Sequence, residues 1–146
     1  MERKSTILFY FYITIGVLAL ILTWAHTPVY FEDGILSGNV KFWQDVLLNS
    51  NPANTFLTVD IFFFAFAAFV WMVIESRRIG MCYVWVYIAL GVFIAISFAF
   101  PLFLAARERQ LSLADKEISS IKLHAADIVG LSLLCLLTIG VGLYLL

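Results

Sequence analysis

The sequence predicts an all-α fold: an integral membrane bundle of four transmembrane helices, with a short interfacial helix in the first loop. Composition is the first observation. Hydrophobic residues make up 63% of the 146 residues and charged residues 13%, whereas a soluble domain carries about 25% charged residues. The second is length, because four apolar stretches each approach the ~20 residues that cross ~30 Å of hydrocarbon. These stretches cover about 6–24, 56–74, 81–105 and 128–146, and together they form one predicted domain.

The first stretch, from about Thr6 to Trp24, invites comparison with a secretory signal peptide because charged residues precede it. Its apolar run is longer than the usual hydrophobic region of such a signal. In addition, Trp24-Ala25-His26 is not a small-residue cleavage site. We therefore predict that this stretch is retained as a transmembrane helix.

The first loop, about residues 26–54, contains a pattern typical of a short helix. Between Asn39 and Leu48 the sequence places four apolar residues on one helical face: Phe42, Trp43, Val46 and Leu47. Because Trp prefers the boundary between lipid and water, this segment is predicted to lie in the membrane interface. A lid folded over the mouth of the bundle is the alternative, and the sequence does not separate the two.

Local signals mark the next two stretches. Asn51 or Asn54 is predicted to cap the second helix, and Pro52 is tolerated in its first turn. Residues 75–80 form a tight polar turn before the third stretch. Pro101 lies inside that third stretch, where it cannot donate a backbone hydrogen bond, so we expect a kink there.

The orientation of the bundle depends on the distribution of Lys and Arg. Four crossings place one basic group on the side of the N-terminus: Arg3, Lys4, Arg77 and Arg78. They place a second group on the opposite side: Lys41, Arg107, Arg109, Lys116 and Lys122. The short, purely basic turn at 77–78 favours a cytoplasmic N-terminus, although the opposite group is no smaller.

Ionisable side chains within the predicted bilayer are the candidate functional groups, because each costs at least about 2.5–3.5 kcal/mol at the centre of a helix. Asp60 lies about one turn inside the second stretch, and Asp127 lies at the start of the fourth, three residues after His124. Four crossings bring one polar set to a single membrane face: Asp60, Arg107, Glu108, His124, Asp127, Glu32 and Asp33. The charged turn at 75–78 is predicted at the opposite face.

Two interpretations of this polar set remain open. In the structural one, Asp60 pairs with Arg107 or caps a helix, and a pair of this kind holds helices in register. In the functional one, burial makes Asp60 a proton donor, and His124 or Asp127 completes an acid–base pair.

Aromatic residues are dense, with 14 Phe, 6 Tyr and 4 Trp. Trp71, Trp85 and Tyr87 lie deep in the predicted spans, where their π faces offer a wall for a carbocation or a polyene. Plain packing is the competing interpretation. The candidate binding residues are Arg107, Glu108, His124, Trp71 and Trp85.

Composition and motifs limit the function classes. A net charge of −1 gives no electrostatic case for nucleic acid. Cys82 and Cys135 lack metal-ligand spacing, and no motif predicts a metal or a cofactor. We expect a small multi-pass membrane protein of uncharacterised function, such as an accessory subunit of a membrane complex. The alternatives are an isoprenoid-modifying enzyme that uses a buried carboxylate as its acid, and a small proton-coupled transporter. The expected partners are membrane lipids, a hydrophobic isoprenoid ligand, other membrane subunits or a second copy of the chain.

Two segments carry a resemblance. They read W-M-x-x-E-x-R-R at 71–78 and P-L-F-L-x-x-R-E-R at 101–109. Over about residues 5–110 the chain resembles a family of small bacterial membrane proteins known as a domain of unknown function. The resemblance implies a multi-pass protein of the bacterial cytoplasmic membrane. Typical members end soon after the second segment, so His124 and Asp127 are not implied as family residues.

The arrangement is also similar to two more distant isoprenoid-linked membrane families, one involved in neoxanthin formation and the other the fungal membrane-bound terpene cyclases. The shared features are an acid early in one helix, an aromatic-rich helix, an acidic and basic turn, and a proline in the next helix. This resemblance implies that Asp60 and Glu75 are the acids to test. With Asp127 from the fourth stretch, they are the candidate catalytic residues.

Overall fold

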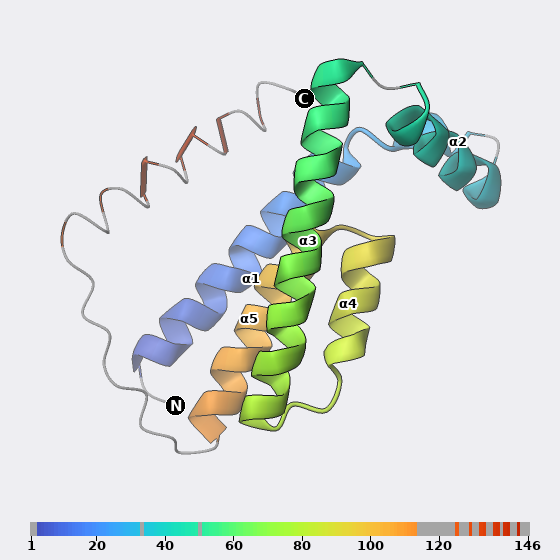
Figure 1. The fold of residues 1–146 in the computed structure, drawn as a ribbon. Helices are drawn as coiled ribbons and strands as arrows, with labels where there is room; N and C mark the ends of the chain where they lie inside the picture. The colour runs from blue at the N-terminus through green and yellow to red at the C-terminus, as the bar shows by residue number, and fades with distance from the viewer. Residues whose placement is uncertain are drawn as a thin grey trace.

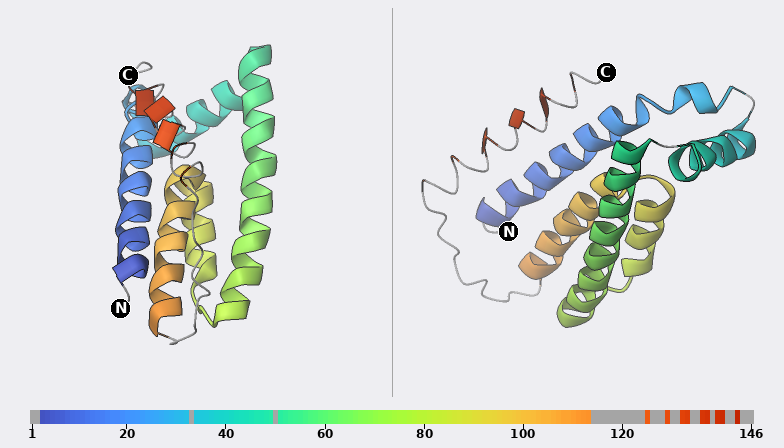
Figure 2. Two further views of the ribbon diagram at one scale, coloured as in Figure 1. Left: turned by 90° about the vertical axis from the view of Figure 1, so that its left-hand side faces the viewer. Right: turned by 45° about the horizontal axis from the view of Figure 1, so that its top comes forward.

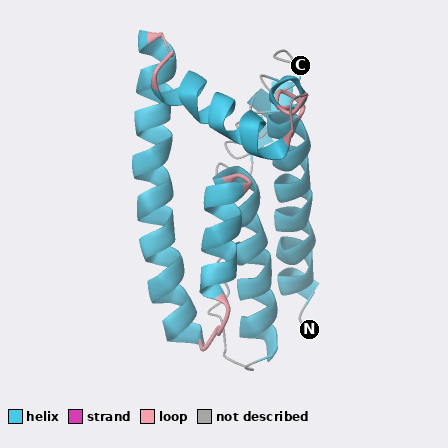
Figure 3. Cartoon of the chain, turned by 90° about the vertical axis from the view of Figure 1, so that its right-hand side faces the viewer, coloured by secondary structure: helices cyan, strands magenta, loops and turns pink. Residues whose placement is uncertain are grey.

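The computed structural model describes residues 3–32, 34–49 and 51–113, together with residues 125, 129, 132–133, 136–137, 139–140 and 143. In this part of the chain the fold is all-α, without strands (Figure 3). The elements follow in the order α1 (Arg3–Trp24), η1 (Pro28–Tyr30), α2 (Ile35–Leu47), α3 (Pro52–Ile79), α4 (Val84–Phe93) and α5 (Ile96–Leu113) (Figure 1). Most of the predicted fourth stretch, 128–146, lies outside the described residues, as do His124, Asp127 and Asp33.

Two of the predicted stretches are confirmed as helices long and apolar enough to cross a membrane. They are Thr6–Trp24 in α1 and Pro52–Ile79, the whole of α3. Asn51 caps α3 as predicted, because its side-chain oxygen accepts a hydrogen bond from the Asn54 backbone N–H at 2.8 Å. Gly80 ends the helix with φ 76°, a left-handed conformation that glycine adopts without steric cost.

The helix predicted in the first loop is also present, as α2. It lies across the tip of the turn between α4 and α5, and it connects to the beginning of α3 (Figures 2 and 3). Ring contacts hold this region together: Tyr30 meets Phe42 edge-on at 5.5 Å, and Trp43 meets Phe62 of α3 at 6.1 Å. The Tyr30 hydroxyl also donates a hydrogen bond to the Asp45 carboxylate, which raises the pKa of the phenol above its ordinary value of 10.

The third predicted stretch, 81–105, is not one helix. It forms two, α4 and α5, and the chain reverses between them at Ile94 and Ala95 (Figure 1). With 10 residues, α4 is about 15 Å long, half the thickness of the hydrocarbon layer. Pro101 lies within α5, which continues through it, so the reversal precedes the residue at which we expected a kink.

The reversal depends on hydrogen bonds that the local sequence does not reveal. The Leu90 carbonyl accepts from the backbone N–H groups of both Ile94 and Ala95, at 2.9 and 3.1 Å. The Ile94 carbonyl accepts a hydrogen bond at 3.2 Å from the indole Nε1 of Trp24, at the end of α1. No glycine or proline occupies positions 94 and 95. A side chain seventy positions earlier therefore contributes a hydrogen bond to the turn.

The helices pack around α5. α1 runs antiparallel to α5, and its Gly16 brings the two backbones close: an added Cβ would lie 3.4 Å from the Phe98 carbonyl oxygen. α3 runs parallel to α5, and the fully buried core between α3, α4 and α5 consists of Met72, Val84 and Phe103. This core is small, and large apolar side chains are exposed along both α1 and α3.

Because α4 and α5 form a hairpin, different charged residues lie together from those expected for a single helix over 81–105. α1 begins, and α3 and α5 end, at one end of the molecule, which we call the basic end (Figure 2). Its Lys and Arg residues are Arg3, Lys4, Arg77, Arg78, Arg107 and Arg109. The prediction that Arg107 and Glu108 lie opposite residues 75–78 is therefore wrong, because the extra reversal returns the chain to the same end. Those residues also belong to the end of α3 and not to the tight turn that we expected.

Candidate functional site

A cluster of four charged side chains ties α3 to α5 near the basic end. The Glu75 carboxylate is its centre. Arg78 donates from Nε to Oε2 and from Nη2 to Oε1, both at 2.7 Å, and Arg107 donates from Nε to Oε1 at 2.6 Å. Arg107 also donates from Nη1 to Oε1 of Glu108 at 2.7 Å. We call Glu75, Arg78, Arg107 and Glu108 the charge cluster.

Helix geometry explains the position of each member. Glu75 and Arg78 lie three residues apart on α3 and so share one face of that helix. Arg107 and Glu108 are neighbours on α5, which runs parallel to α3. One turn deeper, Trp71 contacts Phe100 and Phe103 of α5 edge-on, at 5.7 and 5.8 Å between ring centroids. The aromatic contacts and the charge cluster therefore form one continuous interface between the two helices.

Burial differs among the four members. Side-chain exposure is 7% for Glu75 and 8% for Glu108, but 23% for Arg107 and 63% for Arg78. The two carboxylates are thus enclosed, and Arg107 bridges them. The two guanidinium groups balance the two carboxylates, and among the described residues no buried side-chain nitrogen or oxygen lacks a hydrogen-bond partner.

The charge cluster links α3 to α5 through hydrogen bonds between ionised side chains. Glu75 accepts three charge-assisted hydrogen bonds from two guanidinium groups, which are about twice as strong as neutral ones. These contacts require the carboxylate form, which accepts hydrogen bonds and has no proton to give. In this geometry the Glu75 carboxylate joins α3 to α5.

Asp60, the first candidate acid, lies far from the cluster. It occupies α3 fifteen residues before Glu75, about 22 Å along the helix axis, and it is exposed. The predicted ion pair between Asp60 and Arg107 is wrong, since the Arg107 guanidinium binds Glu75 and Glu108. Asp60 and Glu75 therefore do not share one substrate site. His124 and Asp127, the proposed partners of Asp60, fall outside the described residues.

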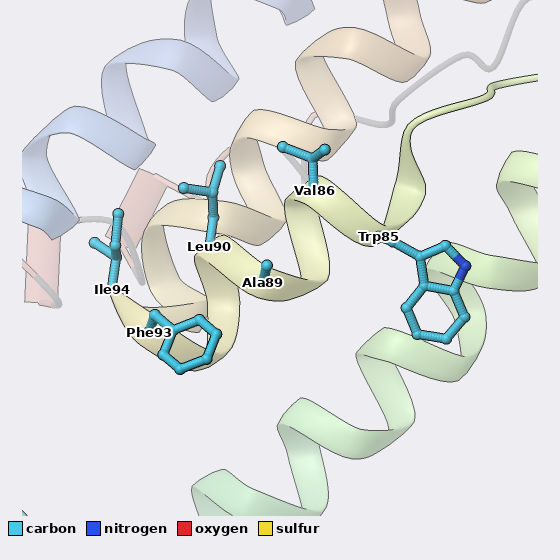
Figure 4. Close-up of a pocket in the computed structure, with 6 residues that line it drawn as sticks. All are labelled: Trp85, Val86, Ala89, Leu90, Phe93 and Ile94. Carbon is cyan, nitrogen blue, oxygen red and sulfur yellow. The ribbon is translucent and has the colours of Figure 1, made fainter.

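The two candidate tryptophans, Trp71 and Trp85, do not line the same cavity. Trp71 packs against α5, as described above. Trp85 lies on α4 with 63% of its surface exposed, beside a shallow hollow that only α4 and the residue after it line (Figure 4). The two side chains therefore do not form one aromatic wall, and the contacts of Trp71 are those of the packing interpretation.

A different aromatic site was missed from the sequence. A groove of about 350 Å³ opens between α2, α3 and the tip of the hairpin. Nine residues line it, among them Trp43, Phe62, Phe66, Phe69, Gly91 and Ile96. We call it the aromatic groove. The phenylalanines at 62, 66 and 69 fall on one face of a helix, which was the available signal, but only the fold brings Trp43 and Gly91 to them.

Comparison with known proteins bears on the interface between α3 and α5. The family model described as "Protein of unknown function DUF2834" matches residues 11–109. The chain belongs to this family. No curated protein and no solved structure matches this chain. The two segments that resemble the family, 71–78 and 101–109, are the two sides of the interface that holds the charge cluster. In this DUF2834 chain they contribute Glu75 and Arg107 to the same ion pair.

Proposed function

We propose that this protein is a multi-pass membrane protein with a non-catalytic role, a small subunit of a membrane complex whose N-terminus faces the cytoplasm. The charge cluster carries the proposal. Its charges are arranged to fasten α3 to α5 at the edge of the apolar layer, and its central carboxylate is occupied by three hydrogen bonds. Such a pair holds helices in a defined arrangement.

Membrane insertion is supported by length and exposure together. α1 and α3 are long and apolar enough to cross a bilayer. In α3 the side chains of Phe62, Phe63 and Phe64 are 50%, 73% and 57% exposed. A row of exposed rings of this kind marks an interaction surface in a soluble protein, and lipid solvates it in a membrane protein.

The hairpin of α4 and α5 supports the orientation. Nine Lys and Arg residues are present in the sequence, and seven of them lie in the described part of the chain. Six of the seven are at the basic end, and Lys41 alone is at the other end. An excess of Lys and Arg near membrane ends favours the cytoplasmic side, so the basic end is proposed to be cytoplasmic.

The same hairpin changes the proposed number of full crossings. α1 leaves the cytoplasmic side and α3 returns to it. α4 and α5 enter and leave from that side as a helical hairpin. If the predicted stretch 128–146 then crosses once, Leu146 lies on the side opposite to Arg3. Four complete crossings would instead place both on one side.

The native cysteines allow a direct test of orientation. Cys82 is exposed in the turn after α3, at the basic end, and a Cys135→Ser variant leaves it as the only thiol. We expect a membrane-impermeant maleimide to label Cys82 in inverted vesicles but not in intact cells. A Gln44→Cys, Cys82→Ser, Cys135→Ser variant reports from α2 and should show the reverse. Labelling of Cys82 in intact cells would contradict the orientation.

The subunit role is tested by native mass spectrometry of the full chain, extracted in mild detergent from its own membrane. We expect an assembly with a second kind of polypeptide in fixed stoichiometry. That assembly should be weakened by substitutions on exposed faces such as Phe63→Ala, and preserved by Glu32→Ala at the first loop. A chain that is always released alone, or only with copies of itself, would contradict the proposal.

A further inference from the structure

Two arginines at the basic end lie outside the charge cluster. Arg77 on α3 and Arg109 on α5 each follow a member of the cluster by two residues, and both are exposed. Within the cluster two guanidinium groups balance two carboxylates. Among the described residues no carboxylate pairs with Arg77 or Arg109. Each of them therefore adds a positive charge that the described carboxylates do not balance.

The register between α3 and α5 places these two arginines at one level. The two helices run parallel (Figure 2), and Arg107 Nε lies 2.6 Å from Glu75 Oε1, which fixes residues 75 and 107 at similar heights. Two further residues on each helix add about 3 Å toward the basic end. Arg77 and Arg109 therefore form one level of positive charge beyond the charge cluster, which we call the arginine layer.

Helix geometry places the two arginines on different sides of the packed helices. Successive residues of an α-helix are about 100° apart, so Arg77 lies about 200° around α3 from Glu75. Arg109 lies about 200° around α5 from Arg107 in the same way. Because Glu75 and Arg107 contact each other between the helices, the two exposed arginines can each contact a ligand of their own.

Arg77 continues the exposed apolar face of α3. Phe66, Val70 and Ile74 follow at four-residue spacing and are 67%, 44% and 62% exposed, and Arg77 comes three residues later on the same face. Exposed apolar side chains of this helix begin at Phe56, about 27 Å before Ile74 along the axis. That length is close to the ~30 Å of the hydrocarbon layer. With these residues in hydrocarbon, Arg77 lies about 4.5 Å beyond its edge, among the lipid headgroups.

Two aromatic residues mark the same level on the neighbouring helix. Tyr83 precedes α4 and is 76% exposed, and Trp85, which extends from the first turn of α4 (Figure 4), is 63% exposed. Tyr and Trp side chains are enriched where lipid headgroups meet hydrocarbon. The beginning of α4 and the end of α3 therefore locate the headgroup level independently of each other.

We infer that the arginine layer binds the headgroups of anionic phospholipids, one at Arg77 and one at Arg109. The inference rests on the proposed placement of α3 in the bilayer. A guanidinium group presents a fork of N–H donors that matches two phosphate oxygens. Its long stem can lie against hydrocarbon while the charge reaches the headgroup. A net positive layer favours a lipid with net negative charge, because in a zwitterionic lipid an ammonium group cancels the charge of the phosphate.

An acidic segment of a partner subunit would be attracted by the same charges. Two observations favour the lipid. The arginine layer directly borders the exposed apolar residues of α3 and the exposed Tyr83 and Trp85. In addition, Arg77 and Arg109 lie on different sides of two packed helices, which suits two separate headgroups better than one polypeptide segment.

The test is a native mass spectrometry titration of the full chain in mild detergent with phosphatidylglycerol and phosphatidylcholine. We expect two molecules of phosphatidylglycerol to bind about fivefold more tightly than phosphatidylcholine, equivalent to about 1 kcal/mol for each charge. Raising ammonium acetate from about 0.05 M to about 0.5 M should reduce this preference, because salt screens exposed charges. Equal binding of the two lipids would overturn the inference.

Charge-removing variants locate the bound lipids. Arg77→Gln and Arg109→Gln should each lower the number of preferentially bound phosphatidylglycerol molecules by one, and the double variant should lower it by two. Lys41→Gln is the control, because Lys41 lies at the other end and its charge is balanced by Asp45 four residues later on α2. It should leave the number unchanged. An unchanged number in the double variant, or an equal loss in Lys41→Gln, would overturn the inference.

The remaining outcomes separate this inference from the proposed function. If the double variant keeps its bound phosphatidylglycerol but loses a second kind of polypeptide, the arginine layer contacts an acidic partner and the lipid inference fails. If the chain needs detergent but binds the two lipids equally, the lipid inference fails and the membrane placement stands. If the chain stays dispersed without detergent and binds neither lipid, the membrane placement fails and the lipid inference fails with it.

Discussion

The two halves of α3 are stabilised in different ways. Near the basic end, Met72 is fully buried and Glu75 is enclosed by three hydrogen bonds from Arg78 and Arg107. Beyond the tip of the hairpin, the same helix exposes one aromatic side chain after another and contacts α2 through Trp43 and Phe62. One half is specified by its own protein partners. The other depends on what surrounds the protein.

This difference between the two halves of α3 predicts which substitutions will lower the free energy of unfolding most. Directional, charge-assisted contacts at the basic end fail abruptly when one partner is removed, because the remaining charge is left unpaired in an enclosed position. Apolar packing contacts are less directional, so apolar substitutions that conserve volume are tolerated there unless atoms collide.

The largest effect is expected for Glu75→Ala. It removes the enclosed carboxylate that ties α3 to α5 and leaves Arg107, which is 23% exposed, with Glu108 as its sole partner in the cluster. Breaking a buried ion pair by removing one partner costs about 3–5 kcal/mol, so the free energy of unfolding in mixed detergent micelles should fall by about that amount. Glu32→Ala, an exposed acid of the first loop, is the control. A loss below about 1 kcal/mol, the value for a surface pair, would show that the cluster does not hold the helices together.

The two arginine partners of Glu75 should differ. Arg107 is 23% exposed and joins two carboxylates across helices, whereas Arg78 is 63% exposed and lies on the same helix as Glu75. We expect Arg107→Ala to cost about 1.5–3 kcal/mol, as for a hydrogen bond to a charged group. Arg78→Ala should cost about 0–1 kcal/mol, as for a solvated pair. The same unfolding titration measures both. Equal losses would mean that the contact within α3, and not the one between helices, carries the stabilisation.

Gly38→Ala tests the attachment of α2. An added Cβ would collide with the backbone carbonyl oxygen of Tyr30 and lie 2.7 Å from Cδ1 of Phe31. Overpacking of this kind costs about 1–3 kcal/mol, and it should raise hydrogen exchange in α2 while leaving α5 protected. Val40→Ala, at an exposed position of the same helix, should leave exchange unchanged. If α5 loses protection as well, the two halves of the molecule are coupled more tightly than the contacts indicate.

The smallest effect is expected for Asp60→Asn. Asp60 is exposed on α3 and forms no ion pair with Arg107. Surface substitutions of this kind change the free energy of unfolding by about 0.5 kcal/mol or less. A larger loss, measured beside Glu75→Ala in the same titration, would show that Asp60 has a structural partner. Loss of a lipid-modifying or transport activity with unchanged unfolding would instead favour an enzyme or a transporter over a subunit.

Local signals were enough to predict much of this fold. The apolar run of α1, the face formed by Phe42, Trp43 and Val46 in α2, and the cap at Asn51 each lie within a few residues of the structure they specify. The predicted motifs at 71–78 and 101–109 also proved to contain the residues of the charge cluster. Their predicted placement at opposite ends of the bundle was wrong, because Glu75 and Arg107 form an ion pair.

That error has one physical origin. Between Val84 and Ala105 the sequence is apolar without a turn residue at Ile94 or Ala95, and a continuous apolar run of that length predicts a single span. The reversal is a tertiary effect, and it brings Arg107 and Glu108 to the end opposite to the predicted one. The aromatic groove was missed for the same reason, since it lies at the tip of that hairpin.

The hydrogen bond from Trp24 to the Ile94 carbonyl has a consequence for the order of biogenesis. On the proposed membrane placement the tip of the hairpin lies in hydrocarbon, where a carbonyl without a partner is costly, so the Ile94 carbonyl is stabilised once the indole reaches it. The ribosome makes α1 first, and we expect α1 to be in place when α4 and α5 emerge. The first helix would then act as a template that converts a nascent transmembrane segment into a hairpin. A Trp24→Phe chain keeps the ring and loses the donor, so during synthesis it should populate the alternative of one uninterrupted crossing.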